Sequence, residues 1–306
     1  MKHSFYSHGK LLLSGEYAVL DGATALAVPT RLGQWLHIEA SATEGLEWQS
    51  QNPDGSSWFN ASFKADDFTQ PNTPTTFPSG IRERLLYMLR AAVTLNPEFA
   101  KKLMGTRVVT QLEFPREWGL GSSSTLISNL AFWAETDPYD LLSATLGGSG
   151  YDIAAARSSG PFLYTLGGDR TPGTQPASFD PVFAGELFFV YLNQKQDSRE
   201  GIARYREQPA PSAEMLKTVS GYSLRLVNAP DLDSFRQALD AHEALLGEIL
   251  GMEPLKKRLF PDYPGSVKSL GAWGGDFILA TGSAQDQDYF RQKGYSVIRP
   301  YREFVL

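Results

Sequence analysis

The chain has 306 residues, 42% of them hydrophobic and 20% charged, which is an ordinary globular composition and enough length for two domains or one large α/β domain. Its 34 acidic and 28 basic residues give a net charge of −6 without any long basic run, which argues against binding a nucleic-acid backbone. The absence of cysteine excludes disulfides and thiolate chemistry, and the 4 histidines lack metal-ligand spacing, which argues against a zinc enzyme.

The N-terminal forty residues predict strands rather than a targeting segment. Residues 10–40 read as strand material broken by the hairpin-turn dipeptide Asp21-Gly22. Their one apolar stretch, "LLLSGEYAVL", is interrupted by Glu16, so neither a secretory segment nor a membrane span is predicted. We therefore expect a cytoplasmic protein without membrane contact.

Helical and strand patterns alternate along the rest of the chain. Apolar residues at helical spacing between Ser79 and Pro97 predict an amphipathic helix, with the serine as its cap and the proline as its stop. Further strands are predicted at 106–114, 185–193 and 295–301, further helices within 118–133, 138–157 and 212–250, a glycine-rich turn entering a strand at 267–282, and a linker at 171–181. This interleaving predicts an α/β (α+β) fold.

The stretch "WGLGSSSTLISNLAFW" places glycines and serines at the mouth of a helix. Gly119 and Gly121 would let the backbone approach an anion, and Ser122, Ser123 and Ser124 offer capping oxygens and hydroxyls for a phosphate or a magnesium ion. A plain helix cap with a flexible lead-in explains the stretch equally well. It matches neither the dinucleotide fingerprint nor the G-x-x-x-x-G-K-[ST] loop.

Two side chains near other glycines suit phosphoryl transfer. Lys10 could neutralise charge on a transferring phosphoryl group, and Asp152 in "GGSGYDIAAA" could accept or orient a hydroxyl proton. Taken singly, a surface lysine and a helix-capping aspartate are the simpler explanations.

Three segments, taken in order, resemble the signature motifs of the galactokinase, homoserine kinase, mevalonate kinase and phosphomevalonate kinase family. They are "GKLLLSGEYAVLDG", "GLGSSS" and "GAWGGDF", here called the first motif, the phosphate loop and the third motif. The resemblance runs from residue 9 to about residue 282 and is closest to mevalonate kinase or phosphomevalonate kinase. It implies two domains, a ribosomal-S5-like ATP-binding half over 1–170 and an α+β half over 182–306, with the site in the cleft between them.

The resemblance also implies ATP with magnesium as the phosphoryl donor, and it assigns roles by position. Asp152 matches the catalytic aspartate, Lys10 the lysine paired with it, Ser123 a magnesium-binding serine and Asp140, offset by about a residue, an acidic magnesium ligand. The nucleotide residues are Gly119, Leu120, Gly121, Ser122, Ser123 and Ser124, and the substrate residues are Ser14, Glu16, Tyr17, Lys195, Ser198, Gly271 and Ala272. Trp273 departs from the family pattern, which has a small residue there; it would narrow the loop or form a wall stacked on a ligand.

We therefore expect an ATP-dependent kinase that moves the γ-phosphoryl group to a hydroxyl of mevalonate or a related small molecule in isoprenoid precursor synthesis. Three alternatives stay open: phosphomevalonate as acceptor, a ligand-binding sensor without turnover, and ATP-dependent decarboxylation. The oligomeric state is not readable from the sequence, and a homodimer stays open.

Overall fold

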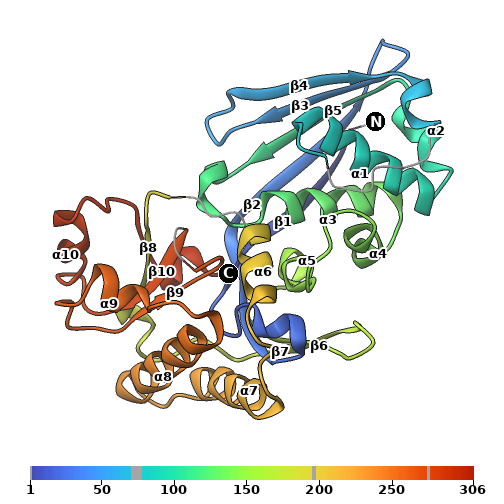
Figure 1. Ribbon diagram of the computed structural model, residues 1–306. Helices are drawn as coiled ribbons and strands as arrows, with labels where there is room; N and C mark the ends of the chain where they lie inside the picture. The colour runs from blue at the N-terminus through green and yellow to red at the C-terminus, as the bar shows by residue number, and fades with distance from the viewer. Residues whose placement is uncertain (1, 70–77, 195–197, 274–275) are drawn as a thin grey trace. The chain divides into compact units, whose positions relative to one another are not determined.

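The computed structural model describes residues 2–69, 78–194, 198–273 and 276–306, and Figure 1 shows their helices and strands. The chain folds into two compact units, each built from separate stretches of sequence. The first unit comprises Met1–Gly9, Leu32–Arg116 and Gly121–Arg157, and the second comprises Lys10–Arg31, Glu117–Leu120 and Ser158–Leu306.

A mixed sheet with helices on one face makes up the first unit. Its strands run in the order β4-β3-β5-β2, in which β3 and β5 are parallel and the other pairs antiparallel, and β1 also pairs with β2. The strands are β1 (His3–Leu12), β2 (Ala25–Ala40), β3 (Leu46–Gln51), β4 (Ser57–Phe63) and β5 (Thr106–Leu112). The end of β1 from Lys10 and the start of β2 up to Arg31 belong to the second unit. The helices are α1 (Ile81–Leu95), α2 (Phe99–Leu103), α3 (Ser122–Ala134), α4 (Pro138–Ser143) and α5 (Tyr151–Arg157), with short 3₁₀ turns η2 (Ala65–Phe68) and η3 (Arg116–Trp118).

Strand alternation and helix amphipathicity produce the core of this unit. On β3 the buried side chains of Leu46 and Trp48 alternate with partly exposed ones, as the two-residue period of a strand requires. They share one core with Leu89 of α1 and Leu130 of α3. The helices therefore cover one face of the sheet, as Figure 1 shows for α1 and α3.

Two leucines of α1 give a matched test of this packing. Leu89 is fully buried and Leu95 is 40% exposed. Leu89→Ala is expected to lower the free energy of unfolding by about 2–5 kcal/mol, because it leaves a cavity in a dry core. Leu95→Ala is expected to cost less than about 1 kcal/mol. Denaturant titration of both variants measures the difference, and equal losses would contradict the assigned core.

The last strands of the same seven-stranded sheet, a four-stranded sheet and a set of helices make up the second unit. The first residues of β2 pair with β6 (Phe162–Leu166), which pairs with β7 (Pro172–Pro176). A separate antiparallel sheet has the order β11-β8-β10-β9, with β8 (Leu187–Tyr191), β9 (Val267–Ser269), β10 (Phe277–Thr281) and β11 (Ile298–Pro300). The helices are α6 (Ser198–Glu207), α7 (Ala213–Val227), α8 (Leu232–Leu250), α9 (Leu255–Leu259), α10 (Gln287–Gln292) and α11 (Tyr301–Phe304), with 3₁₀ turns η1 (Ala18–Asp21) and η4 (Ala184–Glu186).

Three local predictions were wrong. The dipeptide Asp21-Gly22 ends the 3₁₀ turn η1, with the glycine at φ 92° as its left-handed cap, and forms no hairpin. Helix α1 begins after Gly80 without any side-chain cap, so Ser79 does not cap it. The predicted linker at 171–181 contains β7, because its backbone continues the antiparallel ladder with β6.

The predicted division into domains 1–170 and 182–306 stays a prediction. Among the helices within the described ranges, none has both the length and the apolarity needed to cross a membrane.

Candidate functional site

The predicted site residues are shared between the two units. The phosphate loop passes from one to the other, since Gly119 and Leu120 belong to the second unit and Gly121 to the first. Asp152 lies in the first unit and Lys10 in the second, so the pairing of these two side chains stays a prediction.

In the first unit, the phosphate loop ends at the start of a long helix. Gly121 is the N-cap of α3 at φ 86°, a left-handed conformation that glycine adopts without strain. No side chain caps this helix end, so the prediction of serine capping oxygens was wrong. The backbone amides of the first turn, Ser122 to Ser124, and the positive end of the helix dipole are thus not engaged by a capping side chain.

Asp152 lies beside this helix start. The hydroxyl of the buried Ser124 donates a short hydrogen bond to the Asp152 carboxylate, whose other oxygen accepts one from the backbone amide of Ile153 at 3.1 Å. The carboxylate is therefore held within hydrogen-bond reach of the serine turn. Burial, aided by the negative charge of Asp152, raises the pKa of Tyr139 on α4 to about 12.

The two predicted magnesium ligands are exposed. Ser123 lies in the first turn of α3, and Asp140 lies in the first turn of α4, where Asp137 caps the helix. Within the described ranges, no three histidine or acidic side chains are grouped so as to hold a metal ion. The oxygens of Ser123, Asp140 and Asp152 nevertheless suit magnesium, which commonly takes one or two protein oxygens and completes its shell with phosphates and water.

In the second unit, the first motif holds the entry to the phosphate loop. The Lys10 ammonium donates a hydrogen bond to the carbonyl oxygen of Gly119 at 3.0 Å, and the Lys10 amide donates one to the carbonyl oxygen of Leu120 at 3.0 Å. Gly119 has φ 65°, and a Cβ added there would lie 2.4 Å from the Asp276 carboxylate of the third motif. The loop and the third motif thus approach each other more closely than any side chain at residue 119 would allow.

The three predicted substrate residues of the first motif are all buried. The hydroxyl of Ser14 donates to that of Ser223 at 2.7 Å, and the carboxylate of Glu16 accepts from the Lys268 ammonium at 2.6 Å. The ring of Tyr17 stacks on that of Tyr205, with 5.7 Å between centroids. Their side chains therefore make contacts inside the second unit, and their role toward a substrate stays a prediction.

Three of the four remaining predicted substrate residues lie in the described part of the chain. Lys195 is outside the described residues, and Ser198 is the first residue of α6. Gly271 and Ala272 are partly exposed in the turn before β10. Trp273 follows them with φ 52° and is 2% exposed, in an apolar cluster that includes Tyr17, Tyr205, Val219 and Leu246.

Sequence reasoning missed four residues that the structure brings to these motifs. Asp276 was quoted within the third motif but given no role, although a Cβ added at Gly119 or Gly271 would lie 2.4 or 3.4 Å from its carboxylate. Lys268, His242 and Glu243 are fully or almost fully buried and contact the first motif or each other. Lys268 stands between Val267 and Ser269, ahead of the predicted glycine-rich turn, and no local pattern marked it as part of this cluster.

The buried Glu16 makes stability depend on pH. Burial raises its pKa to about 7, against the opposing attraction of Lys268. A carboxyl whose folded pKa is raised binds more protons when folded, so its contribution is present below the unfolded pKa and is lost as pH rises through about 7. The free energy of unfolding is thus expected to fall by at most about 3 kcal/mol between about pH 5 and pH 8. The melting temperature is expected to fall with it. Glu16→Gln is expected to flatten this slope, and an unchanged slope in differential scanning calorimetry would contradict it.

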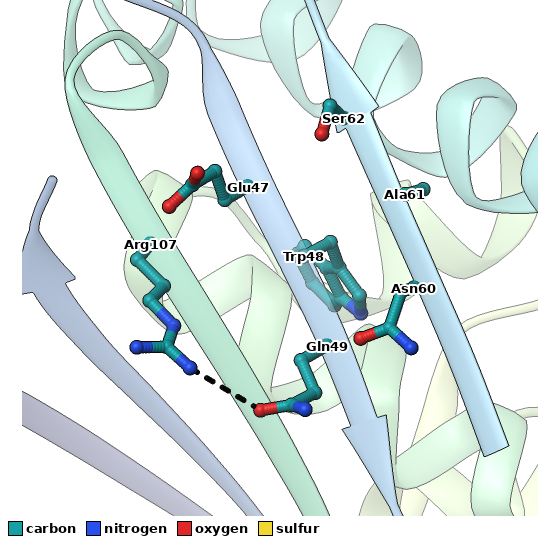
Figure 2. A pocket seen from close by; sticks show the side chains of 7 residues that line it. All are labelled: Glu47, Trp48, Gln49, Asn60, Ala61, Ser62 and Arg107. Atoms are coloured by element: carbon teal, nitrogen blue, oxygen red, sulfur yellow. Dashed lines mark hydrogen bonds between the residues drawn. The ribbon is translucent and has the colours of Figure 1, made fainter. Parts of the chain in front are cut away.

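A shallow pocket of about 570 Å³ lies elsewhere, across β3, β4 and β5 of the first unit. Figure 2 shows its polar lining, in which Arg107 donates a hydrogen bond to Gln49 at 3.4 Å beside Glu47 and Asn60. None of the predicted site residues lines this pocket.

The chain resembles known proteins in its structure, but its sequence matches no family model, and no curated protein matches it. Many solved structures match almost its whole length, and three of them illustrate the likeness. The Methanococcus jannaschii mevalonate kinase matches with a TM-score of 0.70 at 15% identity, covering 98% of both chains.

The Streptococcus pneumoniae phosphomevalonate kinase, in complex with phosphomevalonate and AMPPNP, matches with a TM-score of 0.69 at 17% identity, covering 97% of this chain and 99% of that one. The Lactococcus lactis galactokinase, complexed with galactose, matches with a TM-score of 0.61 at 14% identity, covering 95% of this chain and 88% of that one. The predicted α/β fold is confirmed: the chain has the fold of the galactokinase, homoserine kinase, mevalonate kinase and phosphomevalonate kinase family.

Proposed function

We propose that the protein is an ATP-dependent phosphotransferase that moves the γ-phosphoryl group of ATP to a hydroxyl of mevalonate or a related small molecule. The fold it shares with small-molecule kinases supports the reaction class. The acceptor is proposed on the resemblance of the first motif to mevalonate kinase.

One observation carries the proposal: the hydrogen bond from Ser124, in the first turn of α3, to the carboxylate of Asp152. It holds an acid beside a helix start that no side chain caps. A helix start of this kind suits phosphate oxygens, and a carboxylate next to it can receive or orient the proton of an attacking hydroxyl. A plain helix cap would not require the neighbouring acid.

The residues of the phosphate loop fit a nucleotide and its metal. The amides of Gly121 to Ser124 would bind phosphate oxygens of ATP, and Ser123, with Asp140 or Asp152, would supply oxygens to magnesium. Bound magnesium supplies charge neutralisation on the transferring phosphoryl group. Lys10 is held at the loop by Gly119 and would offset further negative charge.

The proposal is tested by a coupled assay of ADP release with mevalonate, phosphomevalonate, homoserine and galactose as acceptors. ADP release that depends on mevalonate is the expected result. Release only with phosphomevalonate would assign the alternative acceptor, and carbon dioxide release would assign decarboxylation. Nucleotide binding without any release would favour a ligand-binding sensor and would contradict the phosphotransferase.

A further inference from the structure

Three charged side chains from distant parts of the sequence form a buried cluster in the second unit. Lys268 on β9 is 0% exposed, and its ammonium lies 2.6 Å from a carboxylate oxygen of Glu16 in the first motif. The same ammonium lies 3.1 Å from a carboxylate oxygen of Glu243 on α8. The cluster thus joins the first motif, a helix and a strand through one cation.

A second set of contacts fixes the backbone around the cluster. The ammonium of Lys268 also donates to the carbonyl oxygen of Ser269 at 2.6 Å, and the amide and hydroxyl of Ser269 donate to Glu243 at 3.1 and 2.5 Å. Next to Glu243 on α8, His242 accepts a hydrogen bond from the backbone amide of Gly15 at 2.9 Å. Adjacent residues of the first motif, Gly15 and Glu16, are therefore both held at this cluster.

The third motif meets the same cation. The Lys268 ammonium lies 5.5 Å from the centre of the Trp273 ring, within the range of a cation–π interaction. Trp273 has φ 52°, an unfavourable conformation for a bulky residue that persists only where the surroundings hold it. Its indole packs with Tyr17 of the first motif in one apolar cluster.

Stability alone does not account for this arrangement. Taking ions out of water costs more than their attraction commonly returns, and apolar side chains of the same size would serve a core equally well. The cluster has two acids for one lysine. In the part of the chain that the structure describes, Glu16 Oε2, His242 Nδ1 and Trp273 Nε1 are buried without a hydrogen-bond partner. Proteins keep such buried polar groups, in spite of their cost in stability, where the groups fix the positions of functional residues.

We propose that Lys268 is a positioning residue of the phosphotransfer, holding the first motif through Glu16 and the third motif through Trp273. The inference rests on the proposed function. The first motif carries Lys10, which binds the carbonyl of Gly119, and the third motif carries Asp276, whose carboxylate would lie 2.4 Å from a Cβ added at that glycine. A shift of either motif would therefore move the entry to the phosphate loop.

The charges of the cluster give this role a pH signature. Burial raises the pKa of Glu16 to about 7. Burial alone would lower the pKa of Lys268, but the neighbouring carboxylates of Glu16 and Glu243 raise it, so the lysine stays charged. Burial and the charge of Lys268 hold the pKa of His242 well below its usual range, so this imidazole, which meets the ring of Tyr222 edge-on, stays neutral. Glu16 is thus a group of the cluster whose charge changes near neutral pH.

Glu16→Gln tests the proposal, because glutamine keeps the shape of the protonated acid. The wild-type kcat is expected to show an ionisation near pH 7 that Glu16→Gln lacks, with calorimetry showing a folded variant. Amide exchange, corrected for its intrinsic pH dependence, reports on residues 14–17 and 270–273 without any need for turnover. In the wild type it is expected to speed up in both segments as pH rises through 7, and in Glu16→Gln to stay level.

Lys268→Met strengthens the test, and Lys293→Met, which removes a partly exposed lysine 3.7 Å from Asp262, is its matched control. Lys268→Met is expected to speed exchange in both segments by about 10²-fold, because it leaves two buried carboxylates without their cation. If Lys268→Met does not fold, the pH profile of amide exchange in Glu16→Gln tests the proposal by itself. Identical pH profiles of exchange in the wild type and Glu16→Gln would overturn the proposal; absence of ADP release by the wild type would instead refute the proposed function.

Discussion

Asp152→Ala is expected to lower turnover by about 10²–10⁴-fold, the range of general acid–base contributions, while ATP still binds. The reason is local. The Asp152 carboxylate is held by Ser124 and by the amide of Ile153 beside the start of α3, where it can orient the acceptor hydroxyl. Steady-state kinetics of ADP release together with equilibrium binding of ATP measure the two effects separately.

Asp233→Ala is the control for loss of an acid. The side chain of Asp233 is 87% exposed in the first turn of α8, so its removal is expected to leave turnover within about twofold of the wild type. Near-normal turnover in Asp152→Ala would show that the assigned acid is wrong, whatever the reaction.

Gly119→Ala is expected to lower kcat/KM by about 10²-fold, because misplacing a reacting group by about 1 Å has that effect. The new Cβ would lie 2.4 Å from the Asp276 carboxylate, and φ 65° is already unfavourable for alanine. The loop must therefore move, and the carbonyl that binds Lys10 moves with it. Kinetics at varied ATP concentration measure the loss.

Gly147→Ala separates backbone strain from this clash. Gly147 has φ 66°, almost the same conformation, and a Cβ added there would meet nothing within 4 Å. This variant is expected to lose about 1 kcal/mol of stability and to keep its activity. Equal losses of activity in the two variants would show that the close approach to Asp276 has no role.

Local patterns predicted the elements that carry the proposed chemistry. Helical spacing after the serines indicated α3, and Asp152 was expected at the start of a short helix, where α5 begins. Both features are encoded by neighbouring residues, since helix starts depend on capping geometry and on apolar periodicity. The prediction that failed here, serine capping, failed because Gly121 takes the cap position with a left-handed backbone.

The buried cluster was beyond sequence reasoning. Glu16 and Lys268 are 252 residues apart, and no periodicity or turn chemistry links residues at that separation. Glu16 was therefore read as a substrate residue and Lys268 was given no role. Likewise, the burial of Trp273 in one apolar cluster with Tyr17 depends on tertiary contacts that a single sequence does not display.

The central claim is that the γ-phosphoryl group of ATP reaches an acceptor molecule, and following that group tests it most directly. We would incubate the protein with magnesium, mevalonate and ATP radiolabelled in the γ-phosphoryl group, and separate the products. The account predicts label in the acceptor in amounts equal to the ADP formed, and loss of both with Asp152→Ala. Label found only in inorganic phosphate, or left entirely in ATP with every acceptor tried, would contradict it.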